Sequence, residues 1–173
     1  MEFEFKSIIT KKLSKDIIAK ICKLKNLYWN YGLESQYFFF KKNVLSNDIH
    51  NCLFYKKILI GYTMLRKRTV ILKKKKNKYL LFDTLIIHPK FRNNKFSTFL
   101  MIINNYIIKK KKMASFLLCK KKMIKFYSKF CWTVINSKHY FIEDKKTAKH
   151  VLSFNFINSF FLKKDKIRMF TNS

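Results

Sequence analysis

The stretch "HPKFRNNKFSTFL", residues 88–100, marks a change from strand to helix. It follows the apolar run "YLLFDTLII" and precedes "MIINNYII", whose apolar residues recur at helical spacing. The only proline, Pro89, stands at the junction. A basic turn that enters a helix exposes backbone N–H groups without partners, and the helix dipole adds partial positive charge there. The sequence therefore predicts either a phosphate site at this turn or an exposed helix start with a capping role.

Apolar patterns on either side of this stretch predict one mixed sheet with helices around it. Helices are expected at residues 14–29 (with Ser14 as the N-cap), 35–44, 95–111 and 121–130. Strands are expected at 50–55, 58–72, 79–89, 114–119, 131–135 and 151–157, with a lysine-rich turn at 73–78. This order predicts an α/β (α+β) fold with a single mixed, largely antiparallel sheet flanked by helices. We expect one domain over residues 1–173, with a core at 14–136 and a C-terminal extension at 137–173.

The charge of the chain has two interpretations. The chain has 173 residues and a formal net charge of +30, and dense positive charge attracts the phosphates of nucleic acids. However, lysine, asparagine, isoleucine, phenylalanine and tyrosine are abundant, whereas arginine, glycine, alanine and proline are rare. The abundant residues have A/T-rich codons and the lysines lie all along the chain, so we favour coding bias as the cause. In both cases the surface attracts anions, including phosphate-bearing cofactors.

Composition also bears on location and metals. No apolar run approaches the ~20 residues that span a bilayer, and the N-terminus lacks the basic-then-apolar layout of a secretion signal. We therefore predict a cytoplasmic protein that does not bind membranes. The four cysteines form no CxxC pair and the histidines are scattered, so no metal site is expected. The cysteines are interpreted as reduced thiols that pack as small hydrophobic residues.

Three motifs follow one another along the chain: "GYTML" at 61–65, "LIIHPKFRNNKFS" at 85–97 and "MIKFYSKFCWTVI" at 123–135. Together they resemble the GNAT superfamily of acyl-CoA-dependent N-acyltransferases, over roughly residues 14–136. In that family a strand ends near a proline and is followed by Arg/Gln-x-x-Gly-x-Gly/Ala, and a later helix–strand unit reads A-x-x-fY-x-k-x-GF. Here Lys95 and Ser97 replace the two glycines of the first motif, and Cys131-Trp132 replaces the later "GF".

The resemblance implies an acetyl-CoA site at the turn that opened this section. The pantetheine arm is expected to pair with the backbone of Leu85, Ile86 and Ile87, where two central strands separate in the family. A backbone N–H group there stabilises the charge that develops on the thioester oxygen as an amine attacks. Arg92 is expected beside the pyrophosphate, which rests on the backbone N–H groups of Asn93, Asn94, Lys95, Phe96, Ser97 and Thr98.

The resemblance also implies a proton donor. Tyr127 matches the family tyrosine that protonates the leaving thiolate, and a phenol suits this step because its pKa is near that of a thiol. The alternative is a core aromatic residue beside Phe126 and Phe130.

Asp83 is the candidate base for the incoming ammonium. Strand alternation puts Asp83, Leu85 and Ile87 on one face, and a carboxylate inside an apolar strand is costly without a function or a partner. The alternative for Asp83 is an ion pair with Arg66 or Arg68 on the neighbouring strand.

The acceptor side is expected near residues 28–50. Glu34 lies where the family has an acceptor-side loop, and Tyr31 is among the aromatic residues of "YWNYGLESQYFFF". This composition suits a small, partly apolar or sugar-like acceptor. His50 can act near neutral pH, but it opens a strand and a surface histidine is the favoured interpretation.

The sequence thus predicts an acetyl-CoA-dependent N-acetyltransferase, a monomer or homodimer that acetylates a primary amine of a small acceptor by direct attack. An enzyme using a longer acyl-CoA is a variant of this hypothesis. The alternative is a catalytically eroded GNAT-like module that binds nucleic acid or a protein partner. Its lysine runs at 73–76, 109–112 and 120–122 would then form one continuous face rather than separate tips.

Overall fold

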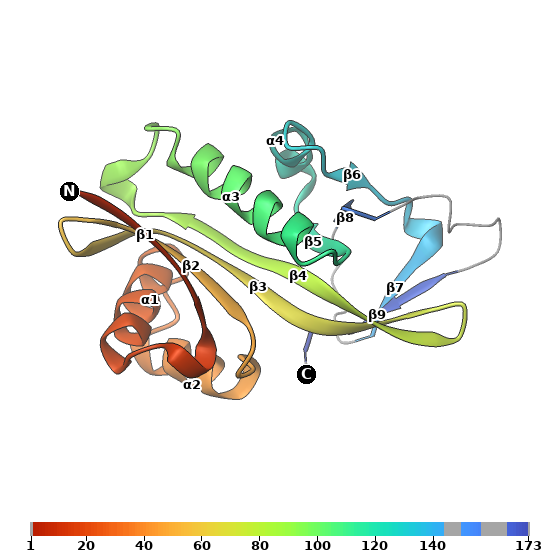
Figure 1. Ribbon diagram of the computed structural model, residues 1–173, viewed down its shortest axis with the longest axis horizontal. Coiled ribbons are helices and arrows are strands. Elements are labelled where there is room, and N and C mark those ends of the chain that lie inside the picture. The colour runs from red at the N-terminus through yellow and green to blue at the C-terminus, as the bar shows by residue number, and fades with distance from the viewer. Residues whose placement is uncertain (1, 144–149, 157–165, 173) are drawn as a thin grey trace. The chain divides into compact units, whose positions relative to one another are not determined.

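The computed structural model describes residues 2–143, 150–156 and 166–172. Its strands form one hydrogen-bonded mixed sheet in the order β1-β2-β3-β4-β5-β8-β6, in which β4 and β5 are parallel. The chain divides into two compact units: unit 1 is Met1–Arg66 with Asp83–Asn104, and unit 2 is Lys67–Phe82 with Asn105–Ser173. Strands β3 and β4 and helix α3 run from one unit into the other. The predicted mixed, largely antiparallel sheet flanked by helices is confirmed (Figure 1).

Unit 1 carries helices on both faces of its strands (Figure 1). Its elements are β1 (Phe3–Ile9), α1 (Lys15–Tyr28), α2 (Leu33–Asn43), β2 (Ile49–Tyr55) and parts of β3 (Ile58–Leu72), β4 (Lys75–Ile87) and α3 (Phe96–Lys110). On the α1/α2 face, buried residues of both helices pack against Tyr62 and Met64 of β3. On the α3 face, Leu100 packs against Leu53 and Ile60.

The helices expected in unit 1 are present, with bounds near those predicted. The side chain of Ser14 accepts a hydrogen bond from the backbone N–H of Ile17 at 3.2 Å and caps α1 as expected. Ile21 and Leu24 of α1 are buried in the core. Helix α2 starts two residues earlier than predicted, after Gly32 at φ +84°.

Two lysine pairs make the tight turns of the sheet. Lys56 and Lys57 join β2 to β3, and Lys73 and Lys74 join β3 to β4, all four with φ between +45° and +68°. Left-handed backbone at both central residues is the signature of type I′ turns, which match the twist of the strands. The predicted turn at 73–78 is therefore too long, because residues 75–78 already belong to β4.

Helix α3 approaches β3 closely at Gly61, one of only two glycines in the chain. A Cβ atom at this position would lie 3.1 Å from Cδ1 of Leu100 and 3.2 Å from Cδ1 of Ile87. An alanine here would require the side chains of Leu100 and Ile87 to move by a few tenths of an ångström. The glycine of "GYTML" thus helps to set the position of the helix that follows the basic turn.

Strand β1 was not predicted, and it changes the environment of His50. Residues of β1 pair with β2 in antiparallel register, with Ile8 opposite His50. His50 is fully buried and stacks on Phe40 of α2, with ring centroids 5.5 Å apart. The prediction of a surface histidine is therefore wrong, because β1 and α2 cover the start of β2.

Unit 2 contains the start of β4, the end of β3, and the later elements. These are β5 (Ser115–Cys119), α4 (Ile124–Ser128), β6 (Thr133–Val134), β7 (Tyr140–Ile142), β8 (His150–Phe154) and β9 (Ile167–Met169). Strand β8 confirms a strand within the predicted range 151–157, but it ends at Phe154, and residue 157 lies outside the described residues. It pairs with both β5 and β6. The short strands β7 and β9 were not predicted. Within the described ranges, no helix is long and apolar enough to cross a membrane.

Candidate functional site

The basic turn of unit 1 begins with one turn of 3-10 helix at Pro89–Phe91. The ring Nδ1 of His88 accepts the backbone N–H of Lys90 at 3.3 Å, and the carbonyl of His88 accepts that of Phe91 at 2.9 Å. The backbone N–H of His88 donates to the carbonyl of Ile60 at 2.7 Å and ties the end of β4 to β3. This hydrogen bond therefore fixes where the turn begins relative to β3.

The approach to α3 needs left-handed backbone at two residues. Asn93 has φ +66° and Lys95 has φ +56°. The carbonyl of Lys95 accepts the backbone N–H of Phe99 at 3.1 Å, so the helical bonds start at Lys95. The backbone N–H groups of the first turn of α3, which includes Ser97 and Thr98, have no partner within the helix and carry the positive end of its dipole. This geometry is a ready-made anion site.

Arg92 stands at the entrance of this turn and is exposed. Its guanidinium carbon lies 5.8 Å from the ring centroid of Tyr28, at the end of α1. This cation–π contact holds the guanidinium near the turn while its N–H groups stay accessible. Asn94 is also exposed, and its side-chain amide donates to the carbonyl of Arg92 at 3.2 Å.

The strand end before the turn alternates between the two faces of unit 1. Ile86 is buried on the α1/α2 face, whereas Leu85 and Ile87 pack on the α3 face with Phe96. In unit 2, the parallel pairing of β4 with β5 covers Leu80 and Leu81 and stops ahead of this segment.

Asp83 does not share a face with Leu85, and that prediction is wrong. Thr84 has φ +63°, and one left-handed residue within a strand shifts the side-chain alternation by one. Asp83 consequently lies on the α1/α2 face, where Nη1 of Arg66 donates to its Oδ2 at 3.1 Å. The ion pair weighed as the alternative for Asp83 is thus confirmed, with Arg66 as the partner.

Arg66 and Lys25 form a buried cationic pair beside Asp83. Both cations are nearly fully buried, and both lie over the ring of Phe39, Lys25 Nζ at 4.2 Å and the Arg66 guanidinium carbon at 5.8 Å. Nη2 of Arg66 also donates to the carbonyl of Asn43 at 2.7 Å. Burial lowers the pKa of Lys25, and the nearby charge of Asp83 opposes that shift. Lys25 was missed, although it lies four residues after Ile21 on the apolar side of α1.

Tyr127 lies in unit 2, and its side chain is buried. Its ring makes edge-on contacts with Phe82, at 6.3 Å between centroids, and with Phe126, at 5.2 Å. Its carbonyl accepts the backbone N–H groups of Phe130 and Trp132. These contacts fix the position of the ring, and its role as an acid stays a prediction.

The acceptor-side candidates Tyr31 and Glu34 belong to unit 1. Tyr31 is 72% exposed, and Glu34 is exposed in the first turn of α2. Both are available for contact with a ligand, and their role likewise stays a prediction. Among residues 2–143, 150–156 and 166–172, no group of three His, Cys, Asp or Glu side chains gathers closely enough to hold a metal.

Solved structures resemble this chain closely in fold, although no protein-family model and no curated protein matches its sequence. An acyl-CoA N-acyltransferase from Pseudomonas aeruginosa has a TM-score of 0.66 at 7% identity, over 87% of this chain and 98% of that chain. A GNAT family N-acetyltransferase from Escherichia coli in complex with CoA has a TM-score of 0.66 at 10% identity, over 98% and 90%. This chain has the GNAT fold. A third example is a Bacillus subtilis N-acetyltransferase in complex with coenzyme A, with a TM-score of 0.55 at 14% identity, over 88% of this chain and 95% of that chain.

Two residues at positions where the resemblance expects motif glycines have left-handed backbone. Lys95 and Cys131 occupy these positions, and both have left-handed backbone, at φ +56° and +62°. Glycine adopts this conformation without the clash that a Cβ atom causes. Lys95 and Cys131 therefore adopt a backbone conformation that favours glycine.

We expect glycine to relieve this strain. The free energy of unfolding should be about 1 kcal/mol higher for Lys95→Gly than for Lys95→Ala. Both variants lose the charge, and only alanine keeps the Cβ atom. Cys131→Gly and Cys131→Ala form a second pair with the same expected sign. Urea denaturation of the four variants measures these differences, and glycine variants no more stable than their alanine partners would contradict the assignment.

Proposed function

We propose that this chain is an acetyl-CoA-dependent N-acetyltransferase that acetylates the primary amine of a small acceptor. The observation that carries this proposal is the turn from Arg92 to Lys95, which combines left-handed backbone, a helix N-terminus and an accessible guanidinium. The fold adds support, because CoA is bound in solved structures that share it. Location in the cytoplasm and the monomeric or dimeric state remain predictions.

The residues of the turn are proposed to bind the diphosphate of the cosubstrate. The backbone N–H groups from Asn93 to Thr98 would donate to phosphate oxygens, and Arg92 would add a forked, charge-assisted contact. The left-handed residues suit this task because they turn successive N–H groups toward one point. The backbone of Leu85 to Ile87 is proposed to pair with the pantetheine arm.

Acetyl-CoA supplies the acetyl thioester, and side chains of this chain are proposed to move the protons. Tyr127 would give its phenol proton to the thiolate that leaves as the nitrogen–carbon bond forms and the carbon–sulfur bond breaks. The second proton that the nitrogen then loses would restore the phenol through solvent. Asp83 would hold the incoming ammonium and accept its proton, directly or through water. Arg66 keeps the Asp83 carboxylate in place, which makes Arg66 a positioning residue. Tyr31 and Glu34 are proposed to contact the acceptor.

The proposed role of Tyr127 predicts a specific kinetic defect. Tyr127→Phe should lower kcat about 100-fold while leaving the binding of acetyl-CoA unchanged, because general acid catalysis contributes on that order. CoA release with a panel of amines, followed by chromatography, measures this; a thiol reagent would also react with the exposed Cys131. Tyr106→Phe is the matched control, since Tyr106 is 63% exposed on α3. Equal rates for Tyr127→Phe and the control would remove Tyr127 from the mechanism.

The placement of lysines in unit 2 weighs against the nucleic-acid alternative. Lys73 and Lys74 form a hairpin tip, the run at 109–112 ends α3 before β5, and the run at 120–122 follows β5. A strand of five residues separates the last two runs by about 16 Å. The runs lie at the ends of different elements, which does not favour one continuous basic face.

A further inference from the structure

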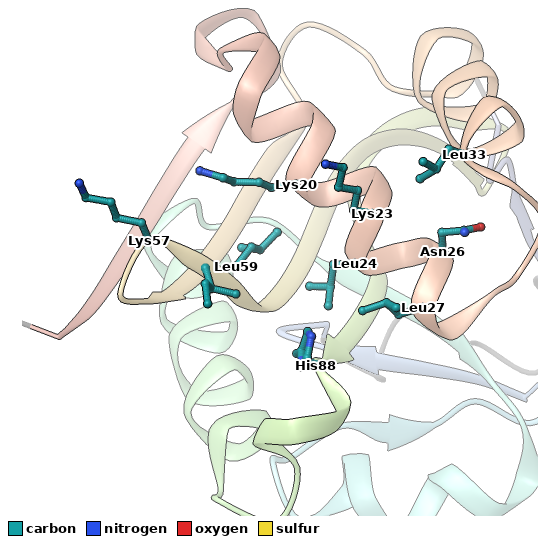
Figure 2. A pocket seen from close by; sticks show the side chains of 10 residues that line it. Lys20, Lys23, Leu24, Asn26, Leu27, Leu33, Lys57, Leu59 and His88 are labelled. Carbon is teal, nitrogen blue, oxygen red and sulfur yellow. The ribbon is translucent and has the colours of Figure 1, made fainter.

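A cavity of about 510 Å³ lies in unit 1 (Figure 2). None of its lining residues is assigned to acetyl-CoA, and Leu33 is the one that falls in the range 28–50 expected on the acceptor side. The cavity is bounded by α1, the first residue of α2, the turn between β2 and β3, and His88. Its volume is typical of small-molecule sites. The lining residues are Lys20, Lys23, Leu24, Asn26, Leu27, Leu33, Lys57, Ile58, Leu59 and His88.

Two of the apolar residues that line the cavity have exposed side chains. Leu24 and Leu59 form its buried floor, in the core shared with Ile86. Leu27 is 59% exposed and Ile58 is 54% exposed. Exposed apolar side chains that gather at a hollow favour a ligand that covers them.

The charged part of the cavity is basic. Lys20, Lys23 and Lys57 line it, and no Asp or Glu side chain of the described residues does. Nζ of Lys20 lies 2.8 Å from Oδ2 of Asp16, which offsets its charge. The net positive charge of the cavity therefore comes from Lys23 and Lys57. Figure 2 shows Lys20 and Lys23 on α1 and Lys57 on the hairpin.

His88 supplies a neutral donor to the same cavity. Burial, followed by the charges of Lys90 and Arg92, lowers the pKa of His88, so its ring is uncharged near neutral pH. Because Nδ1 accepts the N–H of Lys90, the ring proton is assigned to Nε2.

We propose that this cavity binds a soluble small carboxylate with an apolar body. The charges of Lys23 and Lys57 would attract the carboxylate, and the apolar body would cover Leu27, Leu59 and Ile58. The site is separate from the turn that is proposed to bind acetyl-CoA, and ligand binding here does not require that proposal to hold.

Two contacts join the cavity to the basic turn, and their relevance to acetyl-CoA rests on the proposed function. His88 holds the backbone of Lys90 at the start of the turn. Leu27 precedes Tyr28, the ring on which Arg92 rests.

Three eight-carbon probes test the site: octanoate, octan-1-ol and octylammonium. We expect calorimetry to give one saturable site for octanoate, at least tenfold tighter than for either other probe. Leu27→Gln should weaken octanoate binding about tenfold through lost apolar contact. The double variant Lys23→Gln/Lys57→Gln should weaken it by a similar factor through lost charge.

Matched controls separate this result from general surface effects. Ile102→Gln removes a similarly exposed apolar residue on α3, and Lys15→Gln/Lys41→Gln removes the same charge elsewhere in unit 1; both should bind octanoate normally. Equal binding of all three probes, no saturable octanoate binding, or binding that survives the cavity variants would overturn the proposal. Preference for anionic lipid vesicles over free octanoate would overturn it as well. Because no cosubstrate is present, these outcomes are independent of acetyl-CoA binding.

Discussion

Asn104→Ala should lower the free energy of unfolding by about 4 kcal/mol, because it breaks a buried hydrogen-bond network and leaves a cavity. The side-chain amide of Asn104 donates to Oγ1 of Thr63 and to the carbonyl of Leu100, both at 2.7 Å. Its oxygen accepts from the amide of Asn51 at 2.8 Å. Asn104, Asn51 and Thr63 are fully buried, so water cannot replace the lost partner.

Urea denaturation measures this loss, and two variants control it. Ile102 lies on the same helix and its side chain is 58% exposed. We expect Ile102→Ala to change the free energy of unfolding by no more than about 0.5 kcal/mol. The double variant Asn51→Ala/Asn104→Ala should lose less than the sum of the single variants, because it removes both partners of one bond. A loss for Asn104→Ala as small as that for Ile102→Ala would contradict the network. This network matters for function, because it ties α3 and therefore the basic turn to β2 and β3.

The second large effect is a loss of stability in acid that depends on His50. Its Nε2 lies 2.8 Å from Oγ1 of Thr10 and its Nδ1 lies 2.8 Å from the hydroxyl of Tyr62. Burial, with a smaller contribution from the charge of Lys25, lowers the pKa of His50 from 6.5 to about 4. The folded state therefore favours the neutral ring, whereas the unfolded state takes up a proton once the pH falls below 6.5.

The sign of this effect follows from proton binding. Above pH 6.5 neither state binds the proton, and the contribution of His50 is fully present. As the pH falls from 6.5 to about 4, the unfolded state gains the proton first, and about 3 kcal/mol of stability is lost. The free energy of unfolding, measured by urea denaturation, should fall between pH 7 and pH 4.5. In His50→Gln the number of protons taken up on unfolding in this range should be smaller by about one. An NMR titration that places the pKa of His50 near 6.5 would contradict this account.

The parts of the fold that were predicted have strong local signals. The apolar spacing and the Ser14 cap of α1 and the paired lysines at Lys56–Lys57 needed no tertiary information. Strand β1 was missed although "FEFKSII" alternates apolar and charged residues at Phe3 to Lys6, a signal that was available. Strand β9 has three residues, which is too short for any periodic pattern.

The site was less predictable because single backbone angles decide it. No residue in "FDTLI" predicts left-handed backbone at Thr84. This conformation nevertheless places Asp83 on the α1/α2 face, beside Arg66. The left-handed backbone of Lys95 and Cys131 follows only from the family motif, because neither residue type favours it. The burial of His50 likewise depends on β1, which lies more than forty positions away in the sequence.

The most direct test of the account is calorimetric titration of the purified protein with acetyl-CoA, beside Arg92→Ala and the control Lys41→Ala. We expect binding in the micromolar range, weakened about tenfold by Arg92→Ala through the loss of a charge-assisted contact and unchanged by Lys41→Ala. Such a result would support the turn at Arg92 to Thr98 as the diphosphate site. No binding to the unaltered protein, or equal binding to all three proteins, would contradict the central claim.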